Sequence, residues 1–171
     1  GYDVAATEFA DRTVTEADLR AGKANAAGKV IVRDRIADAM FQEALLHPET
    51  YSVLATPNLN GDYLSDALAA QVGGLGLAPG VNRSDTLAFF EATHGTAPNL
   101  AGTDRANPGS LILCGALMLE HMGWNEAANR LNNAMNTILA AGSLTEDLAA
   151  QTAGARTVGC TEFGELVQQA L

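Results

Sequence analysis

Short apolar segments alternate with longer segments of helical spacing along the first half of the chain, and this alternation most constrains the fold. Residues 30–32 are Val-Ile-Val, which is typical of a strand. Residues 36–46 carry apolar side chains at 36, 40, 41, 44 and 45, the spacing of a helix that ends before a proline. Residues 51–55 predict a second buried strand, and residues 61–72 a second helix that ends at two glycines. This order predicts an α/β layered fold.

The second half has a more helical pattern. Residues 110–122 are nearly all apolar, which predicts a helix buried on most sides. The glycines after Val72 predict a domain boundary between residues 1–72 and 73–171. The other predicted elements are a Thr-capped helix over 15–20, strands over 75–78 and 87–90, a helix start at Asn107-Pro108, a helix capped by Asn125, and a short helix after Thr161.

Composition excludes several classes of protein. The chain has 171 residues, of which 47% are apolar and 18% charged, so it can form a core and is not disordered throughout. Its formal net charge of -10, with only two Lys, argues against binding nucleic acid. It contains neither a membrane-span pattern nor a signal-peptide pattern, and we expect a cytoplasmic protein. Cys114 and Cys160 lie too far apart to indicate a zinc or disulfide framework.

Three acidic residues form a candidate metal site. Asp62 and Asp66 lie four residues apart on a predicted helix, so their carboxylates share one face of it. Asp38, in the first turn of the preceding helix, is a third candidate. Three carboxylates suit Mg²⁺ or Mn²⁺ better than zinc. Because acids near helix N-termini commonly serve as caps or balance the helix dipole, a structural role remains open.

Two glycine-containing segments are candidate ligand loops. Residues 73–80 lack the G-x-G-x-x-G pattern because Pro79 occupies the third glycine position, so a tight helix-to-strand connection is the better interpretation. Residues 91–98, Glu-Ala-Thr-His-Gly-Thr-Ala-Pro, follow an apolar strand and are rich in small residues. α/β proteins place ligand sites in such loops, although a lone histidine such as His94 is often structural.

Several of these segments together resemble the C-terminal part of the β-decarboxylating isocitrate/isopropylmalate dehydrogenase family. The resemblance covers almost the whole chain and weakens before about residue 30. It implies a non-Rossmann α/β fold, with residues 1–72 in the small dimerisation and metal-site domain and residues 73–171 in the large cofactor-binding domain. The matching strings are residues 36–39, 58–66 (Asn-Leu-Asn-Gly-Asp-Tyr-Leu-Ser-Asp), 91–98, 107–110, 119–124 and 160–164.

The resemblance also implies site residues. Asp38, Asp62 and Asp66 would surround a catalytic Mg²⁺ or Mn²⁺, with Asp38 supplied across a homodimer interface and no catalytic residue certain beyond a candidate role for Asp62. The metal would polarise the ketone formed by hydride transfer and stabilise the enolate left by loss of CO₂. The implied dinucleotide-binding residues are Glu91, His94, Gly95, Thr96, Ala97, Asn99, Leu100 and Asn107.

Departures from the family pattern favour NAD over NADP. Members that use NADP usually carry Lys-Tyr where this chain has Asn99-Leu100, and Tyr and Arg where it has Glu146 and Ala150. Replacing cationic and phenolic partners, and adding an acid, should disfavour a dianionic 2′-phosphate. The sequence therefore predicts NAD as the cofactor, with NADP as the alternative.

The expected activity is metal-dependent oxidative decarboxylation of isocitrate to 2-oxoglutarate, in a homodimer. Family members are more than twice this length, and their substrate-binding cluster and catalytic Lys and Tyr lie in an N-terminal portion that this sequence lacks. The chain is therefore expected to be inactive alone. The alternatives are an isopropylmalate or homoisocitrate dehydrogenase, and a non-catalytic subunit or truncated module of the same fold.

Overall fold

The computed structural model describes residues 2–171, which form two compact units. The described residues up to Leu64 belong to the first unit, and Ser65–Leu171 form the second. The division falls inside helix α4 (Asn58–Gln71), ahead of the boundary that the glycines at 73 and 74 suggested. The assignment of residues 1–72 and 73–171 to the small and large domains of the family stays a prediction.

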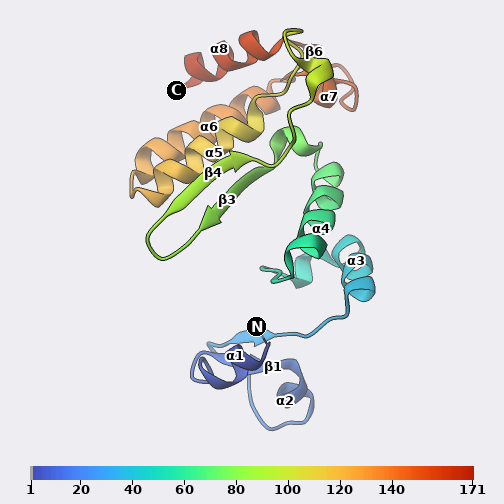
Figure 1. The fold of residues 1–171 in the computed structure, drawn as a ribbon, viewed down its shortest axis with the longest axis vertical. Helices are drawn as coiled ribbons and strands as arrows, with labels where there is room; N and C mark the ends of the chain where they lie inside the picture. Colours follow the sequence, from blue (N-terminus) through green and yellow to red (C-terminus); the bar gives the residue numbers. More distant parts are fainter. Residues whose placement is uncertain (1) are drawn as a thin grey trace. The chain divides into compact units, whose positions relative to one another are not determined.

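The first unit combines short strands with short helices (Figure 1). Strands β1 (Thr13–Thr15) and β2 (Val30–Val32) pair in parallel, with Thr13 opposite Val30. Thr15 Oγ1 accepts a hydrogen bond from the Asp18 backbone N–H, so the predicted threonine cap is confirmed. The helices of this unit are α1 (Tyr2–Thr7), α2 (Glu16–Arg20), α3 (Ala37–Leu46), the 3₁₀ turn η1 (Pro48–Thr50) and the start of α4.

The strand predicted over residues 51–55 is wrong. After η1 the chain runs to the start of α4 without regular structure, and Val53 is 84% exposed. A strand needs a neighbour to bond its backbone, and no described strand pairs with this segment. The apolar pattern alone gave no information about that neighbour.

The second unit is built from an antiparallel hairpin and a series of packed helices (Figure 1). Strands β3 (Pro79–Arg83) and β4 (Ala88–Ala92) pack against α5 (Gly109–His121), α5 packs on α6 (Asn125–Ala140), and α6 packs on α8 (Cys160–Ala170). The smaller elements are η2 (Leu75–Leu77), η3 (Pro98–Leu100), β5 (Ser143–Leu144), α7 (Glu146–Ala149) and β6 (Arg156–Thr157), with β5 and β6 paired in parallel.

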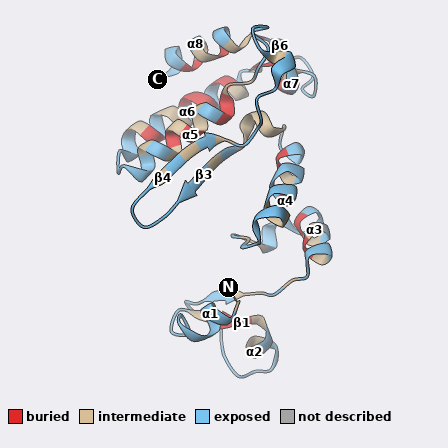
Figure 2. Ribbon diagram, in the orientation of Figure 1, coloured by how far each residue is buried: buried red, intermediate tan, exposed pale blue. Residues whose placement is uncertain are grey.

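The core of the second unit lies between α6 and α8, where Figure 2 marks buried positions on facing helices. Phe163 on α8 is 0% exposed and Met135 on α6 is 1% exposed. Burying a phenylalanine side chain contributes about 1.5–3 kcal/mol relative to leaving it exposed. The amphipathic faces of these two helices therefore fix α8 to the unit. The buried cluster comprises Ala134, Met135, Ile138, Val158, Phe163 and Val167.

Three details of the second half differ from the predictions. Residues 75–77 form a 3₁₀ turn, and the strand begins only at Pro79, because Gly73 and Gly74 take positive φ and turn the chain first. The apolar helix α5 packs against α6, both strands of the hairpin and η2, as predicted for a helix covered on most sides, but Leu111 on it is 63% exposed. Asn125 is the first residue of α6 rather than its cap. The tight helix-to-strand connection predicted for 73–80 is confirmed.

No helix among residues 2–171 has the length and apolar character needed to cross a membrane.

Candidate functional site

The predicted dinucleotide residues other than Glu91, which lies in β4, occupy one segment that follows β4 and leads to α5. The start of this segment is fixed because Thr93 Oγ1 donates to the Ala78 carbonyl at 3.0 Å. Beyond it, His94 Nδ1 lies 2.9 Å from the carbonyl oxygen of its neighbour, and a Cβ built on Gly95 would meet nothing within 4 Å. Small exposed residues leave backbone groups here accessible to a ligand.

Two non-glycine residues in this segment have left-handed backbone conformation. Ala97 has φ 40° and Asp104 has φ 57°. Such a conformation costs a residue other than glycine about 1–2 kcal/mol, and Asp tolerates it better than Ala. Strained backbone of this kind clusters at ligand and switch sites, which fits a functional role for the segment.

Glu91 lies at the end of β4, with an exposed side chain. Asn82 Nδ2 on the paired strand donates to Glu91 Oε1 at 2.8 Å. The Cys114 thiol of α5 lies 3.0 Å from the Glu91 carbonyl oxygen, as a weak donor. The carboxylate is therefore held beside the hairpin, at the entrance to the 93–107 segment.

Asn107 is enclosed by two glycines. A Cβ on Gly76 would lie 2.6 Å from Asn107 Nδ2, and a Cβ on Gly109 would lie 2.9 Å from Asn107 Oδ1. The side chain accepts a hydrogen bond from the Gly109 N–H at 2.8 Å and donates from Nδ2 to Asp147 Oδ2 at 3.0 Å. Asn107 thus holds the first amide of α5 and ties the segment to α7, as well as being a predicted dinucleotide contact.

Arg105 is not among the site residues predicted from the sequence. Its Nε donates to Glu146 Oε2 at 2.5 Å, and both side chains are about half exposed. The hydrogen bond, and then the charge of the guanidinium, lower the pKa of Glu146. Glu146, the acid that was predicted from the sequence to repel a 2′-phosphate, is therefore already paired with a cation. The two residues are 41 positions apart in sequence, so no local pattern could reveal the pair.

The three predicted metal acids are found on exposed helical surface. Asp62 and Asp66 lie on α4 with i,i+4 spacing, while Leu64 and Ala69 of the same helix are buried. Asp38 lies in the first turn of α3, where its Oδ1 accepts the Ala39 N–H at 2.6 Å. The described residues contain no cluster of three or more His, Cys, Asp or Glu arranged to hold a metal. This is compatible with the sequence prediction, in which a second chain supplies Asp38.

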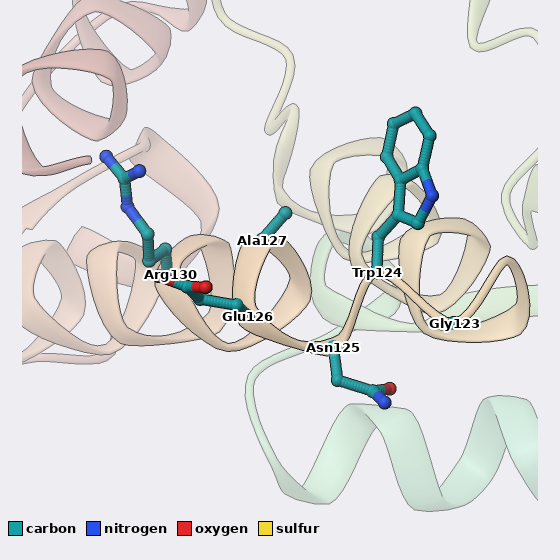
Figure 3. Close-up of a pocket in the computed structure, with 6 residues that line it drawn as sticks. All are labelled: Gly123, Trp124, Asn125, Glu126, Ala127 and Arg130. Atoms are coloured by element: carbon teal, nitrogen blue, oxygen red, sulfur yellow. The ribbon is translucent and has the colours of Figure 1, made fainter.

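A shallow hollow of about 510 Å³ lies at the start of α6, lined by residues 123–127 and Arg130 (Figure 3). Arg130 Nη2 donates to the Leu171 carbonyl. None of the predicted site residues lines this hollow. The close-up shows Trp124 and Asn125 directed away from each other rather than converging on one point.

Comparison with known proteins decides the family. A family profile described as isocitrate/isopropylmalate dehydrogenase matches residues 6–167. The chain belongs to this family. The profile extends over both units and includes all of the predicted dinucleotide and metal residues.

Named relatives refine this likeness. The chain is 53% identical over 166 residues to a protein of Pseudomonas aeruginosa named isocitrate dehydrogenase [NADP], covering 96% of this chain and 40% of that protein. It is 49% identical over 168 residues to the protein of the same name from Helicobacter pylori, covering 98% of this chain and 40% of the relative. The chain therefore spans about 40% of the length of the curated relatives that it matches.

Solved structures confirm the predicted fold class. The crystal structure of isocitrate dehydrogenase from Methylococcus capsulatus matches with a TM-score of 0.77 and 33% identity, over 99% of this chain and 53% of that chain. The TT0538 protein from Thermus thermophilus matches with a TM-score of 0.76 and 29% identity, over 99% of this chain and 37% of that one. The chain is thus part of a larger α/β fold of the isocitrate/isopropylmalate dehydrogenase type.

Proposed function

We propose that the chain supplies the dinucleotide-binding segment and metal-binding carboxylates of an isocitrate dehydrogenase that uses NADP. The reaction would be oxidative decarboxylation of isocitrate to 2-oxoglutarate. The observation that carries the proposal is the 53% identity, over nearly the whole chain, to a relative named for this reaction and this cofactor. Cytoplasmic location and a homodimer, which the sequence also predicted, belong to the proposal.

The proposed cofactor is NADP, whereas the sequence alone predicted NAD. That preference is unsupported, because the curated relatives are named NADP enzymes. One of its physical premises, the added acid, is also weak, since Arg105 forms an ion pair with Glu146. Arg105 lies in the same segment as the predicted dinucleotide contacts and is half exposed, so its guanidinium is available near that segment. A guanidinium binds phosphate strongly through its planar fork of donors.

The donor set fits a hard divalent cation. Asp62 and Asp66 present carboxylates one helical turn apart, and like charges at this spacing destabilise a helix by about 0.2–0.5 kcal/mol. A divalent cation would relieve this repulsion, and carboxylate oxygens are the ligands that Mg²⁺ and Mn²⁺ prefer. When bound, the metal would supply Lewis-acid polarisation of the substrate's oxygens. Asp62, Asp66 and Asp38 of a second copy would hold it.

The remaining part of the enzyme would have to bind the substrate's carboxylates. Isocitrate is a trianion, and the closely spaced pair Arg33 and Arg35 is engaged within the first unit. Arg35 donates to Glu16 at 2.8 Å and to Glu43 at 3.2 Å, and Arg33 donates from Nη1 to the Thr50 carbonyl at 2.7 Å. These guanidinium groups are therefore committed to protein acceptors.

A hybrid enzyme tests the proposal. In it, this chain replaces the matching 40% of the Pseudomonas aeruginosa relative. We expect NADP reduction with isocitrate and Mg²⁺, a kcat/KM for NADP at least tenfold above that for NAD, and no comparable rate with isopropylmalate. A kcat/KM ratio that favours NAD would overturn the cofactor assignment. A folded hybrid active only on isopropylmalate would overturn the substrate, and an inactive folded hybrid would favour a non-catalytic module.

A further inference from the structure

Asp104 joins the predicted dinucleotide segment to a distant helix. Its Oδ1 accepts hydrogen bonds from the Thr161 backbone N–H at 2.8 Å and the Thr161 hydroxyl at 2.7 Å. Its own carbonyl accepts the Cys160 N–H at 2.7 Å. Gly159, which precedes α8, provides no side-chain cap. A carboxylate 57 residues earlier in the chain therefore caps α8. We call these three hydrogen bonds the Asp104 clasp.

The packing around the clasp leaves no room for an additional carbon. A Cβ built on Gly159 would lie 2.2 Å from Asp104 Oδ2 and 3.1 Å from its carbonyl oxygen. Gly159 has φ -76°, a conformation open to any residue. The glycine is required here by the close approach of Asp104 and not by its backbone angles.

The residues after Asp104 make two further long-range contacts. Arg105 donates a hydrogen bond to Glu146 at 2.5 Å, and Asn107 donates one to Asp147 at 3.0 Å. Both acceptors lie on α7. Between Thr93 and Asp104, by contrast, the hydrogen bonds within the described residues are local, such as the one from Thr103 Oγ1 to the Leu100 carbonyl at 2.8 Å. Asp104 is thus the point at which the exposed stretch after Thr93 is attached again to the unit.

The partner of the clasp is itself rigidly held. Phe163, in the first turns of α8, is 0% exposed and belongs to the buried cluster with α6. The Asp104 clasp therefore ties the exposed segment to Thr161, two residues before the buried Phe163. The left-handed φ of Asp104, 57°, is maintained by these bonds at both its side chain and its carbonyl.

We infer that Asp104 is a positioning residue for dinucleotide binding, which orders the segment 93–107 in advance by fixing it to the start of α8. This inference rests on the proposed function. Ordering a loop before the ligand arrives removes part of the cost of binding, so the clasp lowers the KM for the dinucleotide without contacting it. It leaves the chemical step and the affinity for isocitrate unchanged.

Three variants of the hybrid enzyme test how much the Asp104 clasp contributes to NADP binding. Asp104→Ala removes the side-chain acceptor, and Gly159→Ala pushes Asp104 away with no change on the segment itself. Asp104→Asn keeps an acceptor oxygen and tolerates left-handed φ, so it is the conservative variant. We expect the first two to raise the KM for NADP by about tenfold, and Asp104→Asn to raise it by less than about threefold. The kcat and the KM for isocitrate should change by less than about twofold.

Glu162→Gln is the matched control. It breaks the ion pair between Arg156 Nη1 and Glu162 Oε1, 2.6 Å apart, at the same first turn of α8, without touching the segment. We expect the KM for NADP to remain within about twofold of the unsubstituted hybrid. If Glu162→Gln raised the KM for NADP as much as Asp104→Ala does, any weakening of α8 would be enough to raise it. That result would overturn the positioning role of Asp104.

Hydrogen exchange of the chain itself tests the clasp independently of activity. The amides of Cys160 and Thr161 should exchange faster in Asp104→Ala and Gly159→Ala, while those in the middle of α6 stay protected. Unchanged exchange would refute the clasp. A rise in the KM for isocitrate equal to that for NADP would refute its specific role. If the unsubstituted hybrid fails to bind NADPH, the proposed function falls, and the exchange data still decide whether the clasp exists.

Discussion

Replacing Gly76 by alanine tests the close approach between η2 and the predicted dinucleotide segment. The new Cβ would lie 2.6 Å from Nδ2, 2.8 Å from Cβ and 2.8 Å from Cγ of Asn107. Real Cβ atoms do not come this close to another heavy atom, so Asn107 must move. One of its two hydrogen bonds, to Asp147 or to the Gly109 amide, would be lost.

The expected destabilisation follows from three contributions. Inserting a carbon into a packed site costs about 1–3 kcal/mol. Losing a hydrogen bond that is partly exposed to solvent costs about 0.5–1.5 kcal/mol. The lower chain entropy of alanine in the unfolded state offsets about 0.4–1 kcal/mol. The second unit should therefore lose about 1–3 kcal/mol of unfolding free energy.

Urea unfolding of the chain measures this loss, by far-UV circular dichroism and by the fluorescence of Trp124, its single tryptophan. With a slope of about 1–3 kcal/mol per molar urea, the midpoint should fall by about 1 M. Gly164→Ala is the matched control, because a Cβ there meets nothing within 4 Å and the position is inside α8. That change should stabilise the chain by about 0.5–1 kcal/mol.

A double variant makes the reasoning refutable. Asn107→Gly removes the atoms that the new Cβ would meet, so Gly76→Ala should cost less by about 1 kcal/mol or more in that background. If Gly76→Ala leaves the midpoint unchanged or raises it, the close packing of Asn107 against η2 is not a feature of the folded protein.

Three further outcomes are expected. Hydrogen bonds from the Thr161 hydroxyl and then from the Thr161 amide lower the pKa of Asp104 below its ordinary 3.8. The stabilisation that Asp104 contributes is therefore complete above pH 4 and is lost as the pH falls through the lowered pKa. Between pH 4 and 3 the urea midpoint should therefore fall more steeply for the unsubstituted chain than for Asp104→Asn, and parallel curves would contradict this. Asp66→Asn in the hybrid should raise the Kd for Mn²⁺, read from the paramagnetic resonance of free Mn²⁺, by about tenfold or more, whereas equal binding curves would exclude Asp66 as a ligand. Arg105→Gln should lower the NADP/NAD ratio of kcat/KM by about tenfold, and Arg156→Gln, which removes a similar exposed ion pair, should leave the ratio unchanged.

Local patterns predicted the helices well, for reasons visible in the structure. The cap at Thr15 needs only a hydroxyl three residues before an amide. The amphipathic pattern of α6 also depends on spacing within one element. The segment at 51–55 failed because a strand depends on a neighbour that its own residues do not specify. The exposed Leu111 of α5 shows the same limit, since an apolar helix does not state how many of its faces are covered.

The candidate site divides in the same way. The carboxylates of α4 could be placed on one helical face from their spacing alone. The roles of Asp104 and Arg105 could not, because their partners Thr161 and Glu146 lie 57 and 41 residues further along the chain. Neither residue belongs to a motif, and only the fold brings them to α8 and α7.

The cofactor question shows why a charge cannot be interpreted without its neighbours. A lone carboxylate about 4 Å from a phosphate repels it by about 1 kcal/mol per unit of phosphate charge in water. Near a protein surface the repulsion energy is several times larger. The sequence prediction of NAD counted Glu146 as such a repulsion, in addition to the cationic and phenolic partners that Asn99, Leu100 and Ala150 do not supply. Arg105 at 2.5 Å supplies an opposite charge at nearly the same distance from any ligand beside it, so most of that repulsion cancels. Under the proposed function, the guanidinium donors that Glu146 leaves unoccupied would attract the 2′-phosphate that distinguishes NADP from NAD.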